Sequence, residues 1–219
     1  MSQPNVSTTN LTASDTEAGA TLGATLLRVA WLAIILGLVI EAILLLLAAG
    51  VGGIPGIRKI VADIVQKVSW SVIVCVGLAF GKAASKGQPS WTGLSGLFAA
   101  PVAFSVAGTL HKSASYALNL PAGAGVIVPF LIALLKGLEY GALGWLLARV
   151  GKKAGVGAGT YAGVGFVVGL VFGTAIVYSS GSNRAMLAVL PQFINEVLFP
   201  IGCSLALFAA DVLGKRAAK

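Results

Sequence analysis

Six long apolar runs dominate this 219-residue sequence and constrain its fold more than any other feature. A helix that crosses a bilayer needs about 20 mostly apolar residues. Only 10% of the residues are charged and 57% are hydrophobic, whereas soluble domains average about 25% charged residues. The sequence therefore predicts an all-α integral membrane bundle of about six transmembrane helices. The predicted spans are roughly Leu26–Gly50, Val68–Ser85, Trp91–Leu110, Ala122–Val150, Val156–Tyr178 and Met186–Leu213.

The segments outside these runs predict three further regions. Residues 1–24 are polar and rich in Ser, Thr and Ala, which is typical of a disordered tail. Residues 25–213 form the transmembrane domain, and residues 214–219 form a basic C-terminal tail. Residues 56–67 alternate apolar and charged positions at helical spacing, which predicts a short amphipathic helix. That helix either lies in the membrane interface or packs on the surface of the protein itself.

Basic residues lie at the ends of the apolar runs and predict the orientation of the chain. With six spans, nine Lys and Arg residues fall on the side of the termini and five on the other side. The positive-inside rule then places both termini in the cytoplasm, and we expect a bacterial inner (plasma) membrane. The net charge of +8 does not indicate nucleic-acid binding, because the sequence has no basic stripe interleaved with aromatic residues.

Two similar segments raise the question of an internal repeat. The sequence VGLAFGKA at 76–83 resembles VGLVFGTA at 168–175, and Glu41 and Glu139 take similar places in the first and fourth runs. Three spans followed by three spans would give two halves of inverted topology, which is a common transporter plan. In a chain so rich in Gly, Ala, Val and Leu, such a match also arises by chance. Both explanations are open from sequence alone.

Four charged residues fall at membrane depth: Glu41, Lys136, Glu139 and Glu196. A charge at the centre of a spanning helix costs about 2.5–3.5 kcal/mol on insertion scales, so these side chains should face inward and pair. Lys136 and Glu139 stand three residues apart and can pair within one helix. Glu41 and Glu196 then need another partner, a proton or a cation.

Prolines near these charges predict breaks in the helices. Pro200 cannot donate a backbone hydrogen bond to the carbonyl of Glu196, and Asn195 lies beside it. Carboxylate, amide and carbonyl oxygens together suit a hard cation or a proton. Alternatively, Glu196 is protonated and hydrogen-bonds between helices. The predicted breaks are Pro101, Pro129, Pro191 and Pro200, although Pro191 in the first turn of a helix would break nothing.

Glycines recur every four residues in and before the fifth run. Such spacing lets helix backbones approach closely, either within one chain or between protomers. We expect helix packing along two rows, Gly155, Gly159 and Gly163 in one row and Gly165, Gly169 and Gly173 in the other.

Three functions are compatible with these features to different degrees. The first is a small transporter or channel for a cation or a proton-coupled solute, with a midplane site of Glu41, Glu139, Asn195 and Glu196 and with Lys136 as counter-ion. The second is a non-catalytic subunit that binds copies of itself or a larger membrane complex. The third, an intramembrane enzyme, is disfavoured because no nucleophile stands out with its base. The expected partners are the lipid bilayer and a small ion or solute, and neither cofactor nor metal is expected.

Overall fold

The computed structural model describes residues 7–51, 53–121, 129–179 and 186–217, and every element within these ranges is an α-helix. Each of the six helices contains a segment long and apolar enough to cross a membrane. This confirms the predicted all-α bundle with six candidate spans. The helices are α1 (Ser7–Val51), α2 (Ile57–Ala84), α3 (Pro89–Ala117), α4 (Pro129–Val150), α5 (Ala158–Ser179) and α6 (Met186–Ala217).

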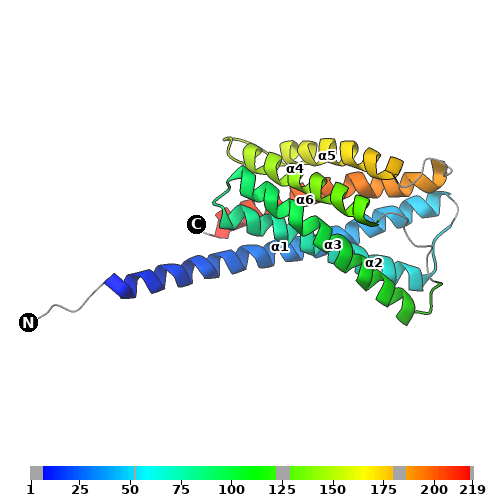
Figure 1. Cartoon of the computed structure of the whole chain (residues 1–219), viewed down its shortest axis with the longest axis horizontal. Helices are drawn as coiled ribbons and strands as arrows, with labels where there is room; N and C mark the ends of the chain where they lie inside the picture. The colour runs from blue at the N-terminus through cyan, green and yellow to red at the C-terminus, as the bar shows by residue number, and fades with distance from the viewer. Residues whose placement is uncertain (1–6, 52, 122–128, 180–185, 218–219) are drawn as a thin grey trace, which may run out of the picture.

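The helices form a ring in chain order. Each helix contacts the next, and α6 returns to contact α1. The helices α2, α4 and α6 also contact one another across the ring, whereas α1, α3 and α5 have no contacts among themselves in the described residues. The start of α1 and the end of α6 lie at the same end of the bundle, which we call the terminal end (Figure 1). The inner layer is therefore α2, α4 and α6, and these helices carry most of the buried polar groups described below.

The helix contacts do not follow the inverted repeat considered from the sequence. Such a repeat would relate α2 to α5, so that the two helices would have equivalent neighbours. In the structure α2 contacts α1, α3, α4 and α6, whereas α5 contacts only α4 and α6 within the described residues. The similar octapeptides thus pack in different surroundings. Small and apolar residues suit both places, which explains their likeness without a structural repeat.

The predicted boundary between an amphipathic helix at 56–67 and a span from Val68 is wrong. Residues Ile57–Ala84 form one continuous helix, α2. No proline interrupts this stretch, and Ala62 is fully buried within the supposed surface segment. The carbonyl oxygen of Ala62 also lies 3.1 Å from His111 Nδ1 on α3. Tertiary packing therefore draws the first turns of α2 into the bundle.

The two predicted tails are also shorter than expected. The helix α1 begins at Ser7, so residues 7–24 are helical where the sequence predicted disorder, and residues 1–6 lie outside the described residues. No proline interrupts residues 7–51, which allows the helix to extend back from the apolar run. At the other end, α6 continues to Ala217, and residues 218–219 lie outside the described residues.

The prolines do not break the helices. Pro101, Pro191 and Pro200 lie inside uninterrupted helices, and Pro129 is the first residue of α4. Residues 122–128, where the fourth span was predicted to begin, lie outside the described residues.

Glycines on neighbouring helices lie close to two carbonyl groups that lose their usual backbone N–H donor to a proline. A Cβ atom added at Gly169 on α5 would lie 3.3 Å from the oxygen of Glu196, which is four residues before Pro200. A Cβ atom added at Gly137 on α4 would lie 2.9 Å from the oxygen of Leu97, four residues before Pro101. Such close approach permits weak C–H···O contacts that compensate part of the lost hydrogen bond.

The two predicted glycine rows differ in their surroundings. Gly165, Gly169 and Gly173 lie against Pro200, Val197 and Glu196 of α6. In contrast, Gly159 and Gly163 have no other atoms within 4 Å of an added Cβ, and Gly155 lies before α5 with a φ angle of +75°. One row therefore packs α5 against α6, whereas Gly159 and Gly163 of the other row face open space within the described part of the chain.

We expect Gly165→Ala to destabilise the α5–α6 contact. The added methyl group would lie 2.5 Å from the oxygen of Pro200 and 2.6 Å from Cα of Ile201, and neither backbone atom can move away easily. Overpacking of this kind costs about 1–3 kcal/mol. Gly159→Ala on the same helix is the control, because its methyl group meets open space. Thermal unfolding of the purified protein in detergent measures both, and equal melting temperatures would contradict the packing described here.

Candidate functional site

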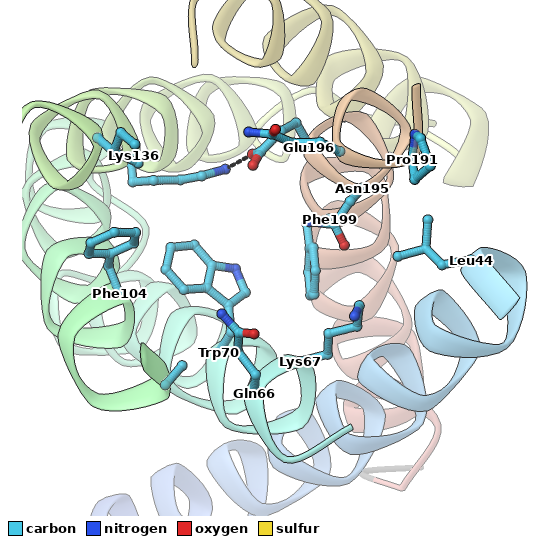
Figure 2. Close-up of a pocket in the computed structure, with 13 residues that line it drawn as sticks. Leu44, Gln66, Lys67, Trp70, Phe104, Lys136, Pro191, Asn195, Glu196 and Phe199 are labelled. Carbon is cyan, nitrogen blue, oxygen red and sulfur yellow. Dashed lines mark hydrogen bonds and ion pairs between the residues drawn. The ribbon is translucent and has the colours of Figure 1, made fainter. Parts of the chain in front are cut away.

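Side chains from five helices surround a cavity of about 300 Å³ (Figure 2). Its rim includes partly exposed side chains such as Gln66 and Lys67, and its floor is made by buried ones such as Trp70, Glu196 and Phe199. The complete lining is Leu44, Gln66, Lys67, Trp70, Phe104, Ala107, Ile132, Lys136, Pro191, Gln192, Asn195, Glu196 and Phe199. A polar interior of this kind within an apolar bundle is expensive and usually functional.

The cavity lies nearer the end of the bundle opposite the termini. Glu196 is the eighth residue of the span Val189–Gly214, and Lys136 is the seventh residue of the span Phe130–Val150. At 1.5 Å per residue, both lie about 10 Å from the start of their spans. A hydrocarbon core is about 30 Å thick. The predicted site therefore does not lie at the midplane. It lies about a third of the way into the membrane, measured from the end of the bundle opposite the termini.

The floor of the cavity contains a buried ion cluster. Lys136 Nζ donates a hydrogen bond to Glu139 Oε2 at 2.7 Å and another to Glu196 Oε2. The same nitrogen lies 5.5 Å from the centre of the Trp70 ring and 5.7 Å from that of Tyr140. Two carboxylates and two aromatic faces thus hold one ammonium group. The sequence predicted the pair of Lys136 with Glu139, and the structure adds Glu196 from α6.

Glu41 has a partner that the sequence analysis missed. Lys67 Nζ on α2 lies 2.5 Å from Glu41 Oε2 on α1, although the angle does not suit a hydrogen bond and Oε2 has no other donor among the described residues. We treat the contact as an ion pair, because Coulomb attraction depends on distance rather than angle. Lys67 was assigned to a surface helix. A signal was nonetheless present, since Lys67 falls in helical phase with the buried residues Trp70, Val74 and Leu78.

The charges of the Lys136 cluster and of the Glu41–Lys67 ion pair do not balance. Three glutamates and two lysines carry one surplus negative charge when all five are ionised, whereas Lys136 alone against the three glutamates would leave a surplus of two. Glu41 and Glu139 do not line the cavity and lie behind Lys67 and Lys136. Glu196 is the only carboxylate in the lining, and it shares Lys136 with Glu139. Glu196 is therefore the group that can best exchange its surplus charge with the cavity.

Three buried oxygen atoms at the site receive no hydrogen bond from the described residues. Glu41 Oε2, Glu139 Oε1 and Asn195 Oδ1 are buried oxygen atoms without a donor among the described residues, and the Tyr140 hydroxyl also has no partner there. An unsatisfied buried polar group costs about 1–3 kcal/mol. Asn195 lines the cavity directly, so a molecule in the cavity can donate to its oxygen. Charge and hydrogen bonding thus both favour a positively charged donor.

The bundle is closed between this cavity and the terminal end. The α2–α6 contact there carries an ion pair between Lys82 and Asp211. Between the ion pair and the cavity lie buried apolar side chains and thiols, including Val74, Leu78, Leu143, Cys203 and Leu207. A second cavity of about 560 Å³, between α2 and α3, is lined by Phe80, Trp91, Phe98 and other uncharged residues. The charged cavity is therefore the stronger candidate site.

The described residues contain no group of three His, Cys, Asp or Glu side chains placed to hold a metal ion. Cys75 and Cys203 are buried free thiols. In comparisons with known proteins, no protein-family model, no curated protein and no solved structure matches this chain. Its function is therefore inferred from the chemistry of the cavity.

Proposed function

We propose that this protein is a membrane transporter that moves a cation, or a solute coupled to protons, through the charged cavity. The observation that carries the proposal is the surplus carboxylate: Glu196 lines the cavity and is 8% exposed, and its one ion-pair partner among the described residues is a lysine shared with Glu139. A buried carboxylate that shares its counter-ion with a second carboxylate costs free energy. A proton or a cation removes that cost, which provides a reason for the site to bind one.

Both lysines keep a carboxylate partner whether or not Glu196 has bound a proton or a cation. In the structure Lys136 is shared between Glu139 and Glu196. When Glu196 takes a proton or a cation, Lys136 remains paired with Glu139, and Lys67 remains paired with Glu41. Proton and cation compete for the same carboxylate, which is the requirement for coupling their movements. Release at the terminal end requires α2 and α6 to separate there, and we expect the Lys82–Asp211 ion pair to open.

The orientation predicted from basic residues completes the proposal. With both termini in the cytoplasm of a bacterial cell, the cavity opens toward the outer face of the inner membrane.

The alternative function, a non-catalytic subunit of a homo-oligomer or a larger membrane complex, has one observation in its favour. Gly159 and Gly163 form an outward row that contacts no other helix in the described residues. However, that role does not require a buried charge cluster, which costs stability. Several oxygen atoms of the site also have no hydrogen-bond donor among the described residues. Transport explains both the cavity and its charges.

Flux in sealed proteoliposomes tests the proposed function. The panel contains inorganic and organic monovalent cations. We expect wild-type protein to dissipate an imposed pH gradient when at least one of these cations is present. The Glu41→Gln, Glu139→Gln, Glu196→Gln triple variant should leave the gradient intact, because no surplus carboxylate remains. Silence of folded wild-type protein with every cation would contradict the proposal and favour the subunit.

A further inference from the structure

We propose that the cation exchanged at Glu196 is a small organic cation that carries N–H donors, and that one such cation exchanges for one proton. This inference rests on the proposed transport function and specifies its substrate class. It is drawn from four features of the cavity: the environment of the Lys136 ammonium, the apolar walls, the unpartnered amide oxygen and the charge balance.

The environment of Lys136 shows which chemical group the cavity floor recognises. Its ammonium donates hydrogen bonds to two carboxylates and faces the rings of Trp70 and Tyr140. Charge-assisted N–H···O bonds combined with aromatic faces also bind alkylammonium and guanidinium groups. Glu196 and Trp70 both line the cavity, so a ligand can reach them without entering the core. The Lys136 side chain is itself an alkylammonium group, and the floor of the cavity already binds it.

The walls and the size of the cavity fit an organic molecule rather than a bare ion. Trp70, Phe104 and Phe199 supply aromatic surface, and Leu44 and Ile132 supply aliphatic surface. Figure 2 shows Trp70, Phe104 and Phe199 around the same space as Lys67 and Lys136. Small-molecule pockets begin at about 300 Å³, which is the volume of this cavity. A hard divalent cation such as Ca²⁺ needs about six to eight oxygen ligands, and the lining does not offer them.

Asn195 adds a requirement for N–H groups. It precedes Glu196 on α6, and its Oδ1 atom is buried without a donor among the described residues. A cation with two or more N–H groups can donate to Glu196 and to Asn195 together. A quaternary ammonium ion has the same charge but no N–H group, so it would leave both oxygens unsatisfied. The site should therefore distinguish two organic cations of equal charge by their hydrogen-bond donors.

The charge balance sets the stoichiometry. The charged groups of the Lys136 cluster and of the Glu41–Lys67 ion pair are Glu41, Glu139, Glu196, Lys67 and Lys136, and their surplus is one negative charge. One proton or one monovalent cation neutralises this surplus, and both together would create a buried positive charge. Exchange of one for one moves no net charge across the membrane.

Proteoliposomes with an acidic interior test this inference with permanently charged probes. Ethylguanidinium carries N–H donors, and tetramethylammonium carries none; neither crosses the membrane as a neutral base. We expect the pH gradient to drive uptake of ethylguanidinium at least about tenfold faster than tetramethylammonium. Glu196→Gln should abolish that uptake and Asn195→Leu should reduce the preference. Asp63→Asn should change neither, because Asp63 pairs with Lys59 outside the cavity lining.

Each outcome has a distinct meaning. Uptake of tetramethylammonium at the same rate as ethylguanidinium would overturn the requirement for N–H donors. Uptake that responds to an imposed potassium diffusion potential would overturn one-for-one exchange. Exchange of sodium or potassium but not of ethylguanidinium would overturn the substrate class and leave the proposed transport intact. Absence of exchange with every cation, from folded protein, would overturn both.

Discussion

Replacing Lys136 with methionine is expected to cost about 3–5 kcal/mol of stability, which is the usual effect of removing one partner of a buried ion pair. The change leaves Glu139 and Glu196 side by side without Lys136 as their counter-ion. Both residues are buried, with exposed fractions of 0% for Glu139 and 8% for Glu196. Methionine keeps the apolar stem against Trp70, so lost packing contributes little. Unfolding of the purified protein in detergent, followed by intrinsic tryptophan fluorescence, measures the loss.

A triple variant separates the lost counter-ion from a general loss of packing. In Lys136→Met, Glu139→Leu, Glu196→Leu the whole cluster becomes apolar, and such replacements are often neutral or stabilising. We therefore expect the triple variant to regain most of the stability that Lys136→Met loses, although it cannot transport. Losses that simply add across the three positions would show that the groups are not coupled. That result would contradict the ion cluster described here.

Glu196→Gln is expected to abolish exchange while leaving the fold intact. The glutamine carbonyl can still accept a hydrogen bond from Lys136, and two glutamates then balance two lysines. Removal of the surplus charge should hold stability constant or raise it. The neutral amide binds neither an exchangeable proton nor the charge of a cation, so the exchanging group is lost. Melting temperature in detergent checks the fold, and a large loss of folded protein would indicate a structural role for this carboxylate.

Features that depend on nearby residues could be predicted from the sequence. Each apolar run is long enough to define a span by itself, which is why all six spans appear in the structure. Lys136 and Glu139 are three residues apart in one helix, so their pairing follows from helical geometry alone. The inward placement of the other charges followed from their cost in lipid.

Features that depend on contacts between helices could not be predicted. Lys67 is 26 positions from Glu41 in the printed sequence, and only the packing of α1 against α2 brings them together. The same packing extends α2 through residues assigned to a surface helix. Pro200 does not break α6, and Gly169 of α5 lies close to the carbonyl of Glu196 that loses its usual backbone donor. No local pattern in the sequence contains these relations.

The rate of proton flux in sealed proteoliposomes tests most directly the central claim that Glu196 carries the exchanged charge. The measurement compares wild type, Glu196→Gln and Asp63→Asn under one pH gradient, with a cation that wild type exchanges. We predict that Asp63→Asn equals wild type and that Glu196→Gln falls to the rate of protein-free liposomes. A folded Glu196→Gln variant that exchanges as fast as wild type would contradict the account.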